Sequence, residues 1–132
     1  MESVARTVLI DTDVIIDFLK GKGKGVKLFE EIITLYSPAT TYINYFELIC
    51  GVRNDEEYAH VENCLSGFSI FSLDRESAEK AARIYQDLKG KKKLIDIRDI
   101  LVSGIAFTHH CEIATNNERD FGRIDDVKLF RL

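Results

Sequence analysis

The sequence contains no tryptophan, only one proline and three cysteines, and it has no long apolar run. A membrane-spanning helix needs ~20 consecutive apolar residues, so we expect no such helix in this chain. The first residues, Met1, Glu2 and Ser3, have none of the features of a secretory signal peptide. The sequence therefore predicts a protein without a membrane segment or a secretory leader.

An excess of basic residues is also missing, because 18 Lys and Arg stand against 22 Asp and Glu, for a formal net charge of −4. Attraction to the nucleic-acid polyanion depends on positive charge, so binding through bulk charge is excluded. A nucleic-acid partner would need a local basic patch, or metal ions that offset the negative field.

The cysteines, Cys50, Cys64 and Cys111, are odd in number, widely spaced and free of any Cys-x-x-Cys pair. This pattern indicates neither a disulfide framework nor a thiolate metal site. We expect reduced thiols that are mostly buried, as is typical of a cytoplasmic protein.

The composition that is present suits a folded domain. Apolar residues make up 45% and charged residues 30% of 132 residues, which is enough for a buried core inside a solvated shell. The length falls in the common range of ~100–150 residues for one domain. With no linker or internal repeat in view, we expect a single domain over residues 1–132.

Short apolar runs alternate along the chain with segments of helical periodicity. Asp13 is expected to cap the first helix, and Thr40 or Thr41 the third. The alternation predicts an α/β domain whose parallel sheet of four to five strands is covered by helices on both faces. The expected strands are 7–10, 36–39, 68–73, 112–114 and 127–132, and the expected helices are 13–20, 26–35, 41–50, 54–65, 74–88 and 97–109.

Polar residues that could bind a ligand or take part in a reaction follow the ends of the strands. Ligands bind at this edge in parallel sheets. Asp11 directly follows the first strand, and residues 115–117 follow the strand at 112–114. Glu47 lies at the edge of an apolar helix stripe. Asp96 and Asp99 are three residues apart, hence on one helix face, and Asp99 is surrounded by apolar neighbours.

Converging carboxylates need compensation, since two of them ~4 Å apart repel by roughly 4 kcal/mol at an effective dielectric constant of 20. Either a divalent cation or protons shared between the carboxylates supply it, and oxygen ligands without His or Cys favour Mg²⁺ or Mn²⁺. Such a centre supports attack of a metal-activated water on a phosphodiester. The alternative remains that each carboxylate is a helix cap or an ion-pair partner of Arg98 or Arg119.

Four segments follow one another in a recognisable order: residues 8–17 (VLIDTDVIID), 45–52 (YFELICGV), 97–102 (IRDILV) and 114–121 (ATNNERDF). Together they resemble the PIN domain, in particular the VapC toxins of prokaryotic toxin–antitoxin pairs, over essentially the whole chain. The resemblance implies a three-layer PIN-like fold with a short twisted sheet, and a Mg²⁺-dependent (or Mn²⁺-dependent) endoribonuclease. It also implies a homodimer, silenced by a cognate VapB-like antitoxin.

The same resemblance assigns the site residues. Asp11, Glu47 and Asp99 match the family's acidic metal ligands, and Thr12 and Thr115 match its supporting polar positions. The family's fourth acid is replaced here by a neutral amide, Asn117, which can still orient a water molecule. Asp96 and Asp120 are further candidates for the missing charge, and Asp13 departs from the family's usual Asn or Ser.

Two basic clusters are candidates for RNA binding, or else ordinary solvated loop charges. Lys22 and Lys24 lie in the glycine-rich loop after the first helix, and Lys91 and Lys92 precede the helix of Asp99. Arg98 adds a further donor to phosphate.

Two other functions fit parts of the pattern. The loss of the fourth acid is compatible with a catalytically weak PIN-like module that binds RNA or a protein partner without cutting. Asp11-Thr12-Asp13 also superficially matches a small phosphatase with an aspartate nucleophile, although those enzymes are longer.

Overall fold

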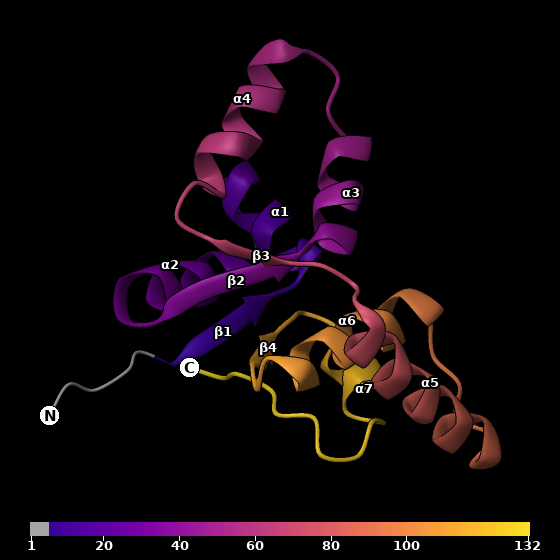
Figure 1. The fold of residues 1–132 in the computed structure, drawn as a ribbon. Helices are drawn as coiled ribbons and strands as arrows, with labels where there is room; N and C mark the ends of the chain where they lie inside the picture. Colours follow the sequence, from indigo (N-terminus) through magenta and orange to yellow (C-terminus); the bar gives the residue numbers. More distant parts are fainter. Residues whose placement is uncertain (1–5) are drawn as a thin grey trace, which may run out of the picture.

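The computed structural model describes residues 6–132, and the expectation about residues 1–3 lies outside them. Each of the first three strands is followed by two helices, and the fourth strand by one short helix (Figure 1). In order they are β1 (Thr7–Ile10), α1 (Thr12–Lys20), α2 (Gly25–Leu35), β2 (Ser37–Thr41), α3 (Tyr42–Cys50), α4 (Asp55–Cys64), β3 (Ser69–Phe71), α5 (Arg75–Gly90), α6 (Ile97–Thr108), β4 (Glu112–Ala114) and α7 (Glu118–Phe121).

The strands form one four-stranded sheet in the order β3-β2-β1-β4, with every neighbouring pair parallel. This confirms the predicted parallel α/β architecture. Leu9 pairs with Ala39 on one side and with Ile113 on the other. Because all strands run the same way, the residues after β1, β2 and β4 meet at one edge of the sheet.

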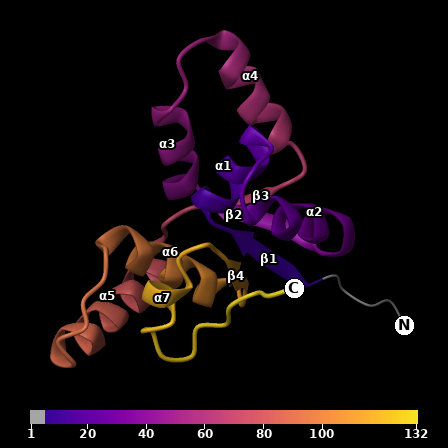
Figure 2. The same cartoon turned by 180° about the vertical axis from the view of Figure 1, so that it is seen from behind.

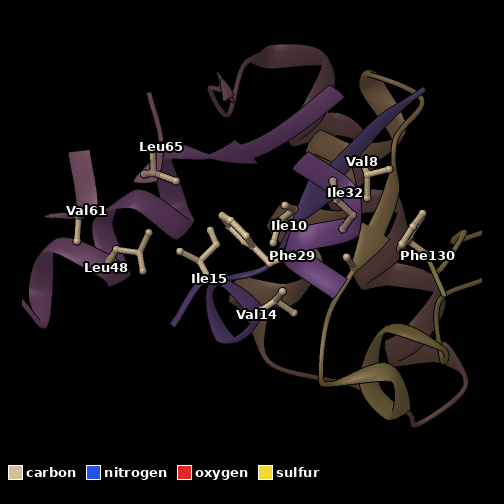
Figure 3. Packing of buried hydrophobic residues seen from close by; sticks show 11 residues of the cluster. Val8, Ile10, Val14, Ile15, Phe29, Ile32, Leu48, Val61, Leu65 and Phe130 are labelled. Atoms are coloured by element: carbon tan, nitrogen blue, oxygen red, sulfur yellow. The ribbon is translucent and has the colours of Figure 1, made fainter. Parts of the chain in front are cut away.

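The alternation of side chains along β1 divides the interior into two cores. Val8 and Ile10 face a cluster built with α1 to α4, whereas Leu9 faces a second cluster built with α5, α6 and α7. All three side chains are fully buried, and burial of such a side chain stabilises the fold by about 1.5–3 kcal/mol. Figure 3 shows the first cluster, and the two groups of helices remain separate from both sides (Figure 1 and Figure 2).

The first helix is capped by Asp11 and not, as the sequence suggested, by Asp13. Asp11 has an extended backbone, with φ −72° and ψ 157°, and its carboxylate accepts the amide hydrogen of Thr12. The chain enters the helix immediately after β1, so Asp13 lies in the first turn. The third helix is capped by Thr41, one of the two predicted residues, in a reciprocal capping box with Asn44.

The expected last strand at 127–132 is wrong. Leu129 makes only an isolated bridge to Ile113, through hydrogen bonds of 2.8 Å that join Ile113 to Lys128 and Phe130. Since β4 has only three residues and pairs with β1 on its other side, it offers the C-terminal segment little edge to extend along. The single turn α7 was not predicted, because four residues are too few for a helical period.

The three thiols are free, as expected, but they differ in burial. Cys111 is buried and Cys64 half-buried, and burial raises the pKa of each to about 11. Cys50 is exposed on the last turn of α3, so the prediction of burial is wrong for this residue. Within residues 6–132 no helix is long and apolar enough to cross a bilayer.

Candidate active site

Three carboxylates from distant parts of the sequence meet at the carboxyl edge of the sheet. Asp11 follows β1, Glu47 lies on α3, and Asp99 lies in the first turn of α6. The exposed fraction is only 2% for Asp11 and 4% for Asp99, while Glu47 is partly buried. The structure thus brings together the three acidic residues that the sequence analysis selected.

The guanidinium of Arg98 lies among these carboxylates. Its Nη2 donates hydrogen bonds to Oδ1 of Asp11 and, at 2.7 Å, to Oε1 of Glu47. Its Nη1 bonds Oδ1 of Asp99, and its Nε is 2.9 Å from both oxygens of Glu47. One cationic side chain therefore pairs with all three acids, which combines the predicted metal ligands with the arginine pairing that the sequence left as an alternative.

This arrangement changes the proton affinity of the groups involved. Burial raises the pKa of Asp99, although its ion pair with Arg98 opposes the rise. Burial also acts to raise the pKa of Glu47, but hydrogen bonds from Arg98 and Thr12 outweigh it, and the pKa is lowered. For Arg98, burial is outweighed by the bonds to Glu47 and Asp11, which raise its pKa. The guanidinium stays charged.

Thr12 on α1 and Asn44 on α3 hold the carboxylates of Glu47 and Asp11 in place. Thr12 Oγ1 donates to Oε1 of Glu47 at 2.6 Å. Asn44, which is fully buried, donates through Nδ2 to Thr12 Oγ1 at 2.9 Å and to Asp11 Oδ1 at 3.1 Å. The sequence analysis selected Thr12 but missed Asn44. A polar residue one turn before Glu47 on an otherwise apolar helix was the available signal.

The loop after β4 closes the other side of the site. Thr115 Oγ1 donates to Oδ2 of Asp11 at 2.7 Å. Asn117 Nδ2 lies 3.2 Å from Oδ2 of Asp99 and 3.2 Å from Oδ2 of Asp120. Asp120 thus reaches the centre through Asn117. By contrast, the side chain of Asp96 caps α6 by accepting the amide hydrogen of Arg98.

A second layer of acids fixes the position of this loop. Asp13 Oδ1 accepts the amide hydrogen of Asn116 at 3.1 Å, and Asp17 Oδ2 accepts from Asn116 Nδ2 at 3.0 Å and from the Gly25 amide at 2.9 Å. Among the described residues, the buried Oδ1 of Asn116 has no hydrogen-bond partner. The loop that carries Thr115 and Asn117 is therefore tied to α1.

Asp13 makes the stability of the protein depend on pH. Burial, and then the charge of Asp11, raise its pKa from 3.8 to about 6. A carboxyl group whose pKa is raised on folding stabilises the fold when protonated, and this contribution is lost as the pH rises through about 6. In EDTA we expect Asp13→Asn to match the wild-type melting temperature near pH 4 and to exceed it at pH 7, as thermal unfolding would show.

Asp125 provides the control of opposite sign. It is exposed, and its hydrogen bond with Lys91 lowers its pKa, so the stabilisation it gives is present at neutral pH and lost in acid. Asp125→Asn should therefore melt slightly below the wild type at pH 7. A melting temperature of Asp13→Asn below that of the wild type at pH 7 would contradict the assignment.

The candidate RNA-binding lysines differ in their surroundings. Lys22, Lys24 and Lys92 are exposed, and Lys24 lines a small hollow of about 200 Å³ together with Thr115 and other residues near the site. Lys91 forms ion pairs with Asp87 at 3.0 Å and Asp125 at 2.8 Å. Its charge is thus largely compensated within the chain.

A larger hollow of about 570 Å³ opens next to Glu47, between α1, α3 and the helix α4 that runs beside them (Figure 1). Apolar side chains such as Leu19, Leu48 and Val61 line it, and Arg53 and Glu57 are among its polar lining residues. The acidic centre is therefore bordered by an apolar surface.

The donor set fits a hard divalent cation. Across residues 6–132, no three His, Cys, Asp or Glu side chains stand in the arrangement of a preformed metal site. Three carboxylates nevertheless turn oxygens toward one cationic group, and oxygen-only donors suit Mg²⁺ or Mn²⁺. The fold and the site together define an α/β domain with an acidic centre at the carboxyl edge of its sheet, where three carboxylates surround one arginine.

The family model of the PIN domain matches residues 8–127, and the chain belongs to this family. It is 25% identical over 129 residues to Ribonuclease VapC1 of Methanocaldococcus jannaschii, covering 98% of this chain and 89% of the relative. It is 30% identical over 129 residues to Ribonuclease VapC1 of Rickettsia felis, covering 92% of this chain and 93% of the relative.

Solved structures share the fold at lower identity. VapBC2 from Rickettsia felis, bound to a DNA fragment from its promoter, has a TM-score of 0.82 at 18% identity, covering 94% of this chain and 97% of the other. FitAcB from Neisseria gonorrhoeae has a TM-score of 0.78 at 24% identity, covering 94% and 96%. The expected PIN-like, VapC-type fold is thereby confirmed.

Proposed function

We propose that this protein is a metal-dependent endoribonuclease of the VapC type, a toxin that hydrolyses RNA phosphodiester bonds in the cytoplasm. The observation that carries the proposal is the convergence of Asp11, Glu47 and Asp99 on one cationic group at the carboxyl edge of a PIN-domain sheet. The relatives named as VapC ribonucleases support the same activity.

Asp11, Glu47 and Asp99 are the residues that would hold Mg²⁺ or Mn²⁺, with Asp120 and Asp96 as further acids nearby. When bound, such an ion lowers the pKa of a coordinated water and stabilises the charge that develops on a phosphate. The hydroxyls that bond these carboxylates, those of Thr12 and Thr115, both donate their hydrogens to them, so water is the simplest nucleophile.

The chain's own polar residues orient this centre. Thr12 and Asn44 hold Glu47 and Asp11 from one side, and Thr115 holds the second oxygen of Asp11 from the other. Asn117 places an amide beside Asp99, where it can hydrogen-bond a water molecule. Fixed carboxylates need little rearrangement during the reaction, which favours catalysis.

RNA would approach this edge through positive charge on the surrounding loops. Lys22 and Lys24 after α1 and Lys92 before α6 are exposed for contact with phosphates. Lys91, already paired with two carboxylates, should contribute less.

A VapB-like antitoxin and a second copy of the chain are the proposed protein partners. Solved relatives are described as toxin–antitoxin complexes, among them one from Klebsiella pneumoniae. The apolar hollow beside Glu47 offers an antitoxin segment a surface next to the acidic centre. Exposed large side chains on α3 and α6, including Phe46 at 67% and Ile97 at 55% exposure, suit a homodimer interface.

One observation favours a second function, that of a catalytically weak module that binds RNA or a protein. Asn117 occupies the position of the family's fourth acid and brings no charge to Asp99 and Asp120. A second metal ion would find fewer anionic ligands there, and binding without cleavage would then be the outcome.

The test is cleavage of a labelled, structured RNA by antitoxin-free protein in Mg²⁺, Mn²⁺ or EDTA, with Asp11→Asn as the control variant. We expect cleavage that needs metal and that the variant loses, which also excludes a contaminating nuclease. Retention of intact RNA would support the binding module, and turnover of a small phosphate monoester would support a phosphatase.

A further inference from the structure

Arg98 occupies the point toward which the three carboxylates turn. Oδ1 of Asp11, Oδ1 of Asp99 and Oε1 of Glu47 each bond its guanidinium. The other oxygens of the two aspartates have different partners, because Oδ2 of Asp11 accepts from Thr115 and Oδ2 of Asp99 accepts from Asn117. A cation bound by all three acids through these oxygens must take the place of the guanidinium.

We propose that Arg98 is a built-in counter-cation of the acidic centre, and that a divalent metal ion must displace its guanidinium in order to bind. The inference rests on the proposed function, since it concerns the metal centre of that same site. Arg98 is adjacent in sequence to Asp99 on α6, so the competing cation is always present at high local concentration. Metal affinity is thereby lowered, and the metal-free protein is protected from repulsion among its own carboxylates.

The guanidinium of Arg98 can leave the centre because its side chain is partly exposed to solvent. The side chain of Arg98 is 21% exposed, whereas the side chains of Asp11 and Asp99, counted without their backbone, are 3% and 5% exposed. A long side chain at the border of solvent can rotate away while the buried carboxylates stay in place. Once displaced, the guanidinium remains next to the metal centre, where it can pair with a phosphate of bound RNA.

The first experiment measures Mn²⁺ binding, without RNA, by calorimetry or by the electron paramagnetic resonance signal of free Mn²⁺. The proteins are the wild type, Arg98→Met and the matched charge control Arg119→Met, whose exposed arginine lies on α7 near the site. We expect Arg98→Met to bind Mn²⁺ roughly 10-fold more tightly than the wild type, and Arg119→Met to bind it equally well.

Thermal unfolding gives a second readout. In EDTA, Arg98→Met should melt at least about 5 °C below the wild type, because three buried or half-buried carboxylates lose their counter-charge. Saturating Mn²⁺ should raise its melting temperature by more than it raises that of the wild type. Equal or weaker Mn²⁺ affinity in Arg98→Met, or no Mn²⁺ binding by either protein, overturns the inference.

A measurement on the wild type keeps the test valid even where Arg98→Met does not fold. The Nε–H of Arg98, bonded to Glu47, should exchange slowly with solvent in EDTA and lose that protection at saturating Mg²⁺, as followed by nuclear magnetic resonance. Persistent protection at saturating Mg²⁺ overturns the inference even if RNA cleavage is metal-dependent. Displacement without any RNA cleavage supports it while the proposed ribonuclease activity fails.

Discussion

Replacing Asp99 by asparagine is expected to lower the rate of RNA cleavage by about 100-fold or more while the protein stays folded. Asp99 is a proposed metal ligand whose carboxylate is held by Arg98 on one side and Asn117 on the other. Asparagine has nearly the same shape but carries no charge, so the affinity of the centre for a divalent cation falls. The measurement is single-turnover cleavage of labelled RNA in Mg²⁺.

The stability of this variant separates loss of chemistry from loss of fold. Burial raises the pKa of Asp99, which means that folding disfavours its charged form. Removing the charge relieves this cost and offsets the lost ion pair with Arg98, so the free energy of unfolding in EDTA should change by less than about 1 kcal/mol. A folded Asp99→Asn protein that cleaves RNA at the wild-type rate would remove Asp99 from the catalytic centre.

Substituting Gly104 by alanine is expected to destabilise the fold by about 2–3 kcal/mol through overpacking. A Cβ atom at this position on α6 would lie 2.5 Å from the backbone oxygen of Ser77 and 2.9 Å from Cβ of Ala81 on α5. Neither neighbour is the flexible end of a side chain, so the two helices must separate. Urea denaturation, followed by circular dichroism, measures the change.

Gly90→Ala is the matched control for this prediction. Gly90 ends α5, and a Cβ atom there would meet no atom within 4 Å beyond its chain neighbours and the backbone of its own helix. The same substitution should leave stability unchanged or raise it by up to about 1 kcal/mol, since alanine favours the helix over glycine. Equal effects at Gly104 and Gly90 would show that the close approach of α5 and α6 does not limit the fold.

Displacement of α6 also has a consequence for activity. This helix carries Arg98 and Asp99 in its first turn, and catalytic geometry tolerates only small shifts of the reacting groups. Gly104→Ala should therefore also reduce RNA cleavage under conditions where the protein remains folded.

The sequence alone was sufficient for the architecture and for the three acids. Apolar runs and helical periods are local patterns, and they predicted the order of the elements and the parallel sheet. Residues that follow parallel strands must share one edge, which placed Asp11 and the loop at 115–117 together. Glu47 and Asp99 stood out as carboxylates on otherwise apolar helices, and the resemblance to PIN domains assigned them to the same site as Asp11.

Local sequence patterns did not correctly predict the strand pairing at the C-terminal end or the residue that caps the first helix. The segment 127–132 is apolar enough for a strand, but its pairing is limited by the short edge of β4 to one bridge at Leu129. The sequence predicted Asp13, and not Asp11, as the cap of the first helix. The point at which the backbone leaves β1 made Asp11 the cap.

The contacts between side chains within the acidic centre depend on the tertiary structure. Arg98 and Asp11 are 87 positions apart in sequence, and Asn44 and Asp11 are 33 apart. No periodicity relates such residues, since their contact depends on how α3 and α6 pack against the sheet. The sequence by itself determined which acids meet at the edge. The packing decided which cation they hold, because three carboxylates brought together, two of them buried, require a positive charge close by.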